Sequence, residues 1–103
     1  MNKLIKKERY FLLFLLTASE RQRKVLIEHI DDSQLKALVQ IVYNVMFGYR
    51  SITSVEKSKL SKRKHIFRKF VNKGISNKQR KKVLKRYLKF ILPFIEVVKK
   101  DIL

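Results

Sequence analysis

Four capping boxes constrain the fold of this chain more than any other feature of its sequence. A capping box is a pair of reciprocal hydrogen bonds at the start of a helix. A short polar side chain accepts from the backbone N–H three residues later, and the Glu or Gln side chain at that later position accepts from the backbone N–H of the first residue. The four pairs are Ser19 with Gln22, Asp31 with Gln34, Thr53 with Glu56, and Ser76 with Gln79. Each pair precedes an apolar pattern, which predicts four helix starts.

The spacing of apolar residues predicts five helices. The clearest amphipathic face lies on the third, where the residues at helical spacing are Leu35, Leu38, Val39, Val42 and Met46. The predicted helices cover residues 3–17, 20–30, 33–47, 54–72 and 77–100. The sequence shows no internal repeat and no low-complexity linker. We therefore expect an all-α fold, a compact bundle of four to five helices, in one domain over residues 1–103.

Glycine and proline mark where these helices end or bend. Gly48 follows the third apolar segment and Gly74 follows the fourth, where a left-handed C-terminal cap favours glycine. Pro93 is predicted to kink or restart the fifth helix, because its ring clashes with the carbonyl four residues back.

Charge divides the chain into two unequal halves. The formal net charge is +18, and self-repulsion at that charge opposes a compact state unless a polyanion neutralises it. Residues 1–52 carry nine basic and five acidic side chains, whereas residues 53–103 carry 17 basic and three acidic ones. The first half is therefore expected to supply most of the core, and the second half to present basic helices to an acidic partner.

The segment Lys57–Lys89 carries the strongest functional signal. It contains 15 basic residues among 33 and no acidic one, yet apolar residues recur through it at helical spacing. A disordered basic tail lacks such residues, so a folded polyanion-binding surface is predicted, with a merely solvated face as the alternative. Lys outnumbers Arg by 18 to 8 in the chain, which favours contacts with phosphates over base reading. The candidate nucleic-acid-binding residues are Lys59, Lys62, Arg63, Lys64, Arg68, Lys69, Lys73, Lys78, Arg80, Lys81, Lys82, Lys85, Arg86 and Lys89.

No constellation typical of an enzyme is present in the sequence. The chain has no Cys and only two histidines, His29 and His65, so neither thiol catalysis nor a metal site built on these residues is expected. His29 lies near Glu28, Asp31 and Asp32, but a surface histidine beside acidic residues that complement a helix dipole is the better interpretation. We expect no enzymatic activity, no cofactor and no metal.

Two apolar features leave alternatives open. The run "YFLLFLLTA" follows a basic leader and could form a signal peptide, a membrane-surface helix or a core helix, of which the core helix is favoured. Tyr49, Tyr87 and Phe90 could stack on the bases of a single strand, although aromatic residues at helical spacing are more often part of a core.

Two segments resemble a known family of small basic helical proteins. They are "ASERQRKVLIEHIDDSQLKALVQIVYNVMFG" and "KSKLSKRKHIFRKFVNKGISNKQRKKVLKR". The shared features are Arg21 and Arg23 at the second helix start, Asp31–Asp32, Asn44, Gly48, a basic helix around Leu60, and a lysine run after Ser76. The proteins of this family are encoded by Polinton/Maverick-type elements and by adintovirus-like double-stranded DNA viruses of animals. The resemblance spans about residues 12–86; "YLKFILPFIEVVKKDIL" then replaces the family's glycine-containing ending. It implies a viral or mobile-element protein, such as a core or packaging component.

The leading functional hypothesis is binding of DNA without sequence specificity, to neutralise or condense it. The expected partner is double-stranded DNA, with homo-oligomers and virion proteins as further partners and membrane contact less favoured. The expected location is intracellular, in a host nucleus or a virion. The alternatives are a minor structural or membrane-active virion protein, and a helix-turn-helix regulator that reads DNA with the helix at 33–47. The apolar face of that helix and its single charge, Lys36, oppose the last alternative.

Overall fold

A computed structural model of the chain describes residues 3–48 and 52–103. It is compact and all-helical, with principal extents of 33 × 30 × 25 Å. Seven helices lie in the described ranges: α1 (Lys3–Lys7), α2 (Arg9–Thr17), α3 (Glu20–Glu28), α4 (Asp32–Met46), α5 (Ser54–Ser61), α6 (Lys64–Val71) and α7 (Asn77–Ile102). The all-α prediction is confirmed, whereas the expected count of four to five helices is too low.

All four predicted capping boxes are formed, and they begin α3, α4, α5 and α7. At the start of α4, for example, the Gln34 backbone N–H donates to Asp31 Oδ1 at 2.7 Å, and the Asp31 N–H donates to Gln34 Oε1 at 3.1 Å. Each box satisfies two donors that would otherwise lack a partner inside the helix. The strongest local signal in the sequence therefore gives the correct starts.

Two predicted helices are each divided in the structure. The segment 3–17 breaks at Glu8, whose φ and ψ of −97° and 15° separate α1 from α2. The segment 54–72 breaks at Arg63, with φ −129° and ψ 40°, where three basic residues interrupt the apolar pattern. Each break gives the two short helices different sets of contacts. Helix α1 contacts α4 and α2 contacts α7, whereas α5 contacts α7 and α6 contacts both α4 and α7.

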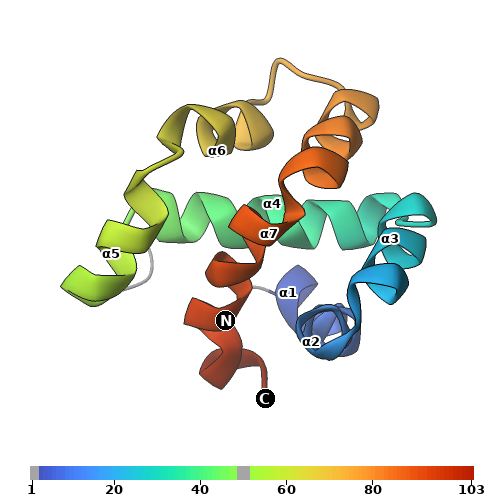
Figure 1. Cartoon of the computed structure of the whole chain (residues 1–103), viewed down its shortest axis with the longest axis horizontal. Coiled ribbons are helices and arrows are strands. Elements are labelled where there is room, and N and C mark those ends of the chain that lie inside the picture. Colours follow the sequence, from blue (N-terminus) through green and yellow to red (C-terminus); the bar gives the residue numbers. More distant parts are fainter. Residues whose placement is uncertain (1–2, 49–51) are drawn as a thin grey trace.

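Helix α7 bends at Tyr87 and not at Pro93. Tyr87 has non-helical φ and ψ of −120° and 20°, whereas Pro93 lies inside the helix. The bend occurs where α7 crosses the long central helix α4 (Figure 1). It allows Val83 and Leu84 before the bend, and Ile91 after it, to be buried together. Tertiary packing therefore places the bend, and the prediction of a kink at Pro93 is wrong.

The two glycines behave differently. Gly48 has φ +78° directly after the C-cap of α4, as the left-handed cap requires. Gly74 has no positive φ; its backbone N–H donates to Asn72 Oδ1 at 2.7 Å in the connection after α6. Only the Gly48 prediction is correct, because α6 ends at Val71 and Asn72 leaves the helix in an extended conformation.

One continuous core draws on both halves of the chain. Helix α4 supplies six buried residues, among them Leu38 and Val42 with no exposed surface. The later helices supply the two largest fully buried side chains, Phe70 and Phe94, and Phe67 packs edge-on against Phe94 with ring centroids 4.6 Å apart. The first half was expected to supply most of the core, but α6 and α7 are equally part of it.

The N-terminal apolar run takes part in this core. Leu12 and Leu15 of α2 have no exposed surface, as the core-helix interpretation requires. Tyr10 and Phe14, on the other face, are 72% and 48% exposed. Within the described residues, no helix combines the length and the apolar character needed to cross a membrane.

Candidate nucleic-acid interface

The candidate cations gather around α6, the connection after it, and the part of α7 that precedes the bend. Helices α6 and α7 contact each other, and α6, the connection after it and the beginning of α7 lie on the same side of α4 (Figure 1). The helix predicted over residues 54–72 is broken at Arg63, so Lys62 and Lys69 do not lie on one continuous helix. The Lys59 side chain, like Tyr49, lies outside the described part of the structure.

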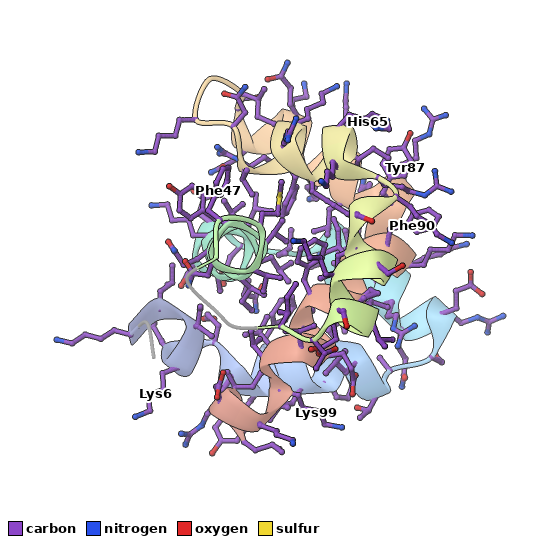
Figure 2. The ribbon with its side chains drawn as sticks, turned by 90° about the vertical axis from the view of Figure 1, so that its left-hand side faces the viewer. Lys6, Phe47, His65, Tyr87, Phe90 and Lys99 are labelled. Carbon is purple, nitrogen blue, oxygen red and sulfur yellow. The ribbon has the colours of Figure 1, made fainter. Side chains whose placement is uncertain are left out.

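Seven of these cations have an exposed side chain with no hydrogen-bond or ion-pair partner among the residues that the structure describes. We call them the open basic surface: Lys62, Lys64, Arg68, Lys69, Lys73, Lys78 and Lys82. Side chains with nitrogen ends extend outward over this side of the molecule (Figure 2). Because the sequence has no acidic residue from 57 to 95, no carboxylate from these segments can neutralise the seven.

Arg80 differs from these seven because its guanidinium is used within the fold. Its Nε donates to the Phe70 carbonyl at 3.0 Å, Nη2 to the Asn72 carbonyl at 2.6 Å, and Nη1 to Asn77 Oδ1 at 3.0 Å. Two of these acceptors are carbonyls at the C-terminal end of α6, which lack partners inside the helix. Arg80 therefore joins α6 to α7 and is a structural residue.

Arg23 repeats this arrangement in the first half of the chain. It follows the capping box Ser19…Gln22 as Arg80 follows Ser76…Gln79, so the segments read "SERQR" and "SNKQR". Arg23 Nε and Nη2 donate to the carbonyls of Leu15 and Leu16, both at 2.8 Å, at the end of α2. The shared pattern Ser-x-x-Gln-Arg is therefore a local repeat of five residues, although no internal repeat was predicted from the sequence.

Lys81 and Lys85 are held by a single acidic residue of α3. Lys85 Nζ lies 2.7 Å from Glu28 Oε2, and Lys81 Nζ donates to the Glu28 carbonyl oxygen at 2.6 Å. The hydrogen bond and charge of Lys85 lower the pKa of Glu28 below its usual value of 4.5. These two lysines connect α3 to α7, so they are less available to a ligand than the open basic surface.

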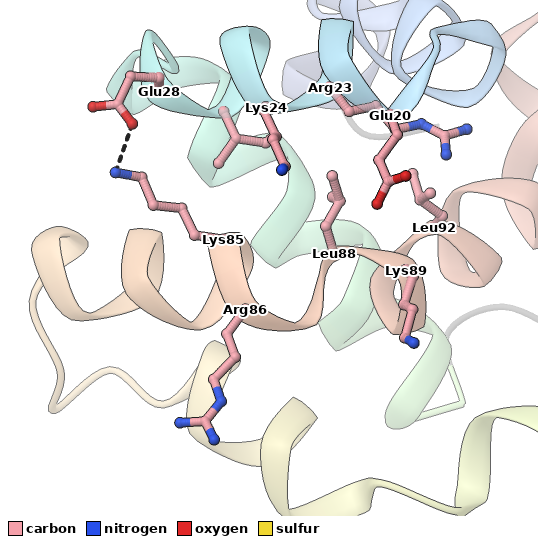
Figure 3. Close-up of a pocket in the computed structure, with 10 residues that line it drawn as sticks. Glu20, Arg23, Lys24, Glu28, Lys85, Arg86, Leu88, Lys89 and Leu92 are labelled. Carbon is pink, nitrogen blue, oxygen red and sulfur yellow. Dashed lines mark ion pairs between the residues drawn. The ribbon is translucent and has the colours of Figure 1, made fainter.

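A groove of about 580 Å³ lies between α3 and α7. Ile27, Leu88 and Leu92 provide apolar lining, and the Glu28–Lys85 ion pair lies at one end (Figure 3). Lys24 and Lys89 also line it, but so does the carboxylate of Glu20. Because both signs of charge meet here, the groove is a less uniform anion site than the open basic surface.

The remaining candidates, Arg63, Arg86 and Lys89, lie against aromatic rings near the α7 bend. Arg63 Cζ is 4.0 Å from the centroid of the Phe90 ring, and Lys89 Nζ is 5.2 Å from the same centroid. Arg86 Cζ is 5.5 Å from the Tyr87 ring centroid. Arg63 lies in the connection between α5 and α6, so its contact with α7 is long-range and could not be read from sequence spacing.

Comparisons of the chain with protein-family models, with curated proteins and with solved structures find no match.

Proposed function

We propose that this protein binds DNA through its phosphates without reading the base sequence, and that it neutralises or condenses the bound polyanion. The observation that carries the proposal is the open basic surface, seven exposed cations with no acidic partner among the residues that the structure describes. Solubility requires only a modest net charge and is usually served by mixed signs. Six of the seven cations are lysines, which act as point charges, and Arg68 is the one arginine among them.

The arrangement suits a duplex backbone better than a base-reading groove. Duplex DNA carries about one negative charge per 1.7 Å of its axis, and cations on two helices and their connection can meet several phosphates at once. Helix α4, the reader in the helix-turn-helix alternative, is the central helix and buries six of its residues. Among its residues, Asp32 and Lys36 are the ones classed as exposed, which leaves few side chains to read a major groove. The resemblance to proteins of viral and mobile elements suggests the same role, a core or packaging component.

Titration of random-sequence duplexes at several salt concentrations tests the proposal. If the seven cations each displace one counterion, the slope of log K against log salt is about −6. Affinities for unrelated sequences should agree within a few-fold. A shallow slope, or strong preference for one sequence, would contradict phosphate-directed binding.

A membrane-active role is the second candidate, and one observation favours it. Tyr10 and Phe14 are exposed on α2, close in sequence to Lys6 and Lys7 of the basic α1. Aromatic residues beside lysines suit the surface of an anionic bilayer. Vesicles of anionic lipid therefore belong in the same titration. If they bind more tightly than DNA does, and Tyr10→Ser with Phe14→Ser abolishes that binding, the membrane role is the better one.

A further inference from the structure

Three contacts between cations and aromatic rings meet at the bend of α7. Arg63 and Lys89 lie over Phe90, at 4.0 and 5.2 Å, and Arg86 lies 5.5 Å from the Tyr87 ring centroid. The two rings are neighbours, with centroids 6.4 Å apart and planes inclined by 42°. Three cations and two rings therefore form one cluster, which we call the bend cluster.

The fold places this cluster where a ligand can reach it. Tyr87 is the residue at which α7 leaves helical geometry. Tyr87 and Phe90 pack against the core but are only half-buried, so each residue keeps part of its surface exposed. Tyr87 and Phe90 lie on the same side of the molecule as His65 of α6 (Figure 2). Arg63, Arg86 and Lys89 are exposed, so the cluster extends the open basic surface with flat groups.

The chemistry of the cluster differs from that of the open basic surface. Isolated lysines attract phosphates but have no flat surface for a base. An exposed aromatic ring, or a guanidinium stacked on one, offers a planar surface on which any base can stack, and nearby cations hold the phosphate. Bases in a closed duplex have their faces covered, so only an unpaired base can use such a surface.

We infer that the bend cluster stacks an unpaired base, so that single-stranded nucleic acid is a ligand of this protein in addition to the duplex. The inference rests on the proposed function, because the open basic surface must hold the backbone on either side. Tyr87 provides the principal stacking ring, Phe90 fixes Arg63 beside it, and Arg86 pairs with the adjacent phosphate.

The test compares three probes of similar length at one salt concentration: a thymidine 12-mer, an abasic deoxyribose-phosphate 12-mer and a random 12-base-pair duplex. The thymidine strand should bind about tenfold more tightly than the abasic strand, the gain expected for about one stacked base. Tyr87→Leu should abolish that ratio and leave the abasic and duplex affinities unchanged.

Tyr10→Leu is the matched control. Tyr10 is exposed, and like Tyr87 it has an arginine over its ring, with Arg9 Cζ 4.9 Å from the centroid, but it lies on α2. Its replacement should leave the ratio at about ten. Because the chain has no Trp, tyrosine fluorescence gives a second readout: Tyr87→Phe should keep the affinity ratio and lose most quenching by the thymidine strand, whereas Tyr10→Phe should keep both.

The outcomes separate this inference from the proposed function. If thymidine and abasic strands bind equally to the unaltered protein while the duplex still shows a steep salt slope, base stacking is refuted and phosphate binding stands. If none of the three probes binds, both are refuted. Equal loss of the ratio in Tyr87→Leu and Tyr10→Leu would also refute the assignment to the bend cluster.

Discussion

Replacing Arg80 by Gln should destabilise the protein, although Arg80 belongs to the most basic part of the sequence. The change removes the three hydrogen bonds that the guanidinium donates to Phe70, Asn72 and Asn77. Hydrogen bonds to charged groups contribute about 1.5–3 kcal/mol each. Arg80 is only partly buried, so water can replace some of them, and a net loss of about 2 kcal/mol is expected. Gln keeps a comparable helix propensity.

Urea unfolding followed by circular dichroism at 222 nm measures this loss. With a slope of about 1–3 kcal/mol per M urea, the midpoint should fall by about 1 M. Arg68→Gln is the control, since Arg68 is exposed and has no partner in the described structure; its effect should stay within about 0.5 kcal/mol. Equal midpoints for the two variants would show that Arg80 does not hold α6 to α7, and would return it to the phosphate-binding candidates.

Two further changes test local features of the fold. Gly48→Ala should cost about 1 kcal/mol in urea unfolding because Gly48 has φ +78°. Gly74 has no positive φ, so Gly74→Ala should cost less, although its added Cβ lies 3.1 Å from Asn72 Oδ1 and that exposed side chain must shift slightly. Lys85 lowers the pKa of Glu28, so the stability from this pair is complete above pH 4.5 and is lost as the pH falls through the lower folded value. Glu28→Gln should remove that pH dependence of the unfolding midpoint and, by freeing Lys85, steepen the DNA salt slope by about one unit.

Local signals in the sequence predict the starts of helices well. A capping box lies within four consecutive residues, and all four, from Ser19 to Ser76, form as expected. Ends and bends depend on packing between distant segments, so they are predicted less well. Pro93 has the stronger local tendency to bend a helix, yet α7 bends at Tyr87, where it crosses α4.

The candidate site shows the same division. The sequence identifies a stretch rich in cations, but it cannot separate the exposed cations from those that join helices. Arg80, Lys81 and Lys85 look like Lys78 and Lys82 in sequence, and only the folded chain shows their acceptors. The recurrence of Ser-x-x-Gln-Arg was a usable signal for Arg80, since the same pattern places Arg23 at the end of α2.

The most direct test of the account compares two variants that lose the same number of charges from different places. In the first, Lys69, Lys73, Lys78 and Lys82 of the open basic surface become Gln. In the second, the exposed lysines Lys3, Lys6, Lys7 and Lys36 become Gln. Circular dichroism verifies that both variants remain helical before DNA binding is measured.

The measured quantity is the slope of log K against log salt for a random duplex. If the open basic surface binds the duplex, the slope should be about −6 for the unaltered protein, about −3 for the first variant and about −6 for the second, since each phosphate contact contributes about −0.9. If the two variants give the same slope, position on the surface does not matter, and the open basic surface is a solvated face and not the DNA-binding site.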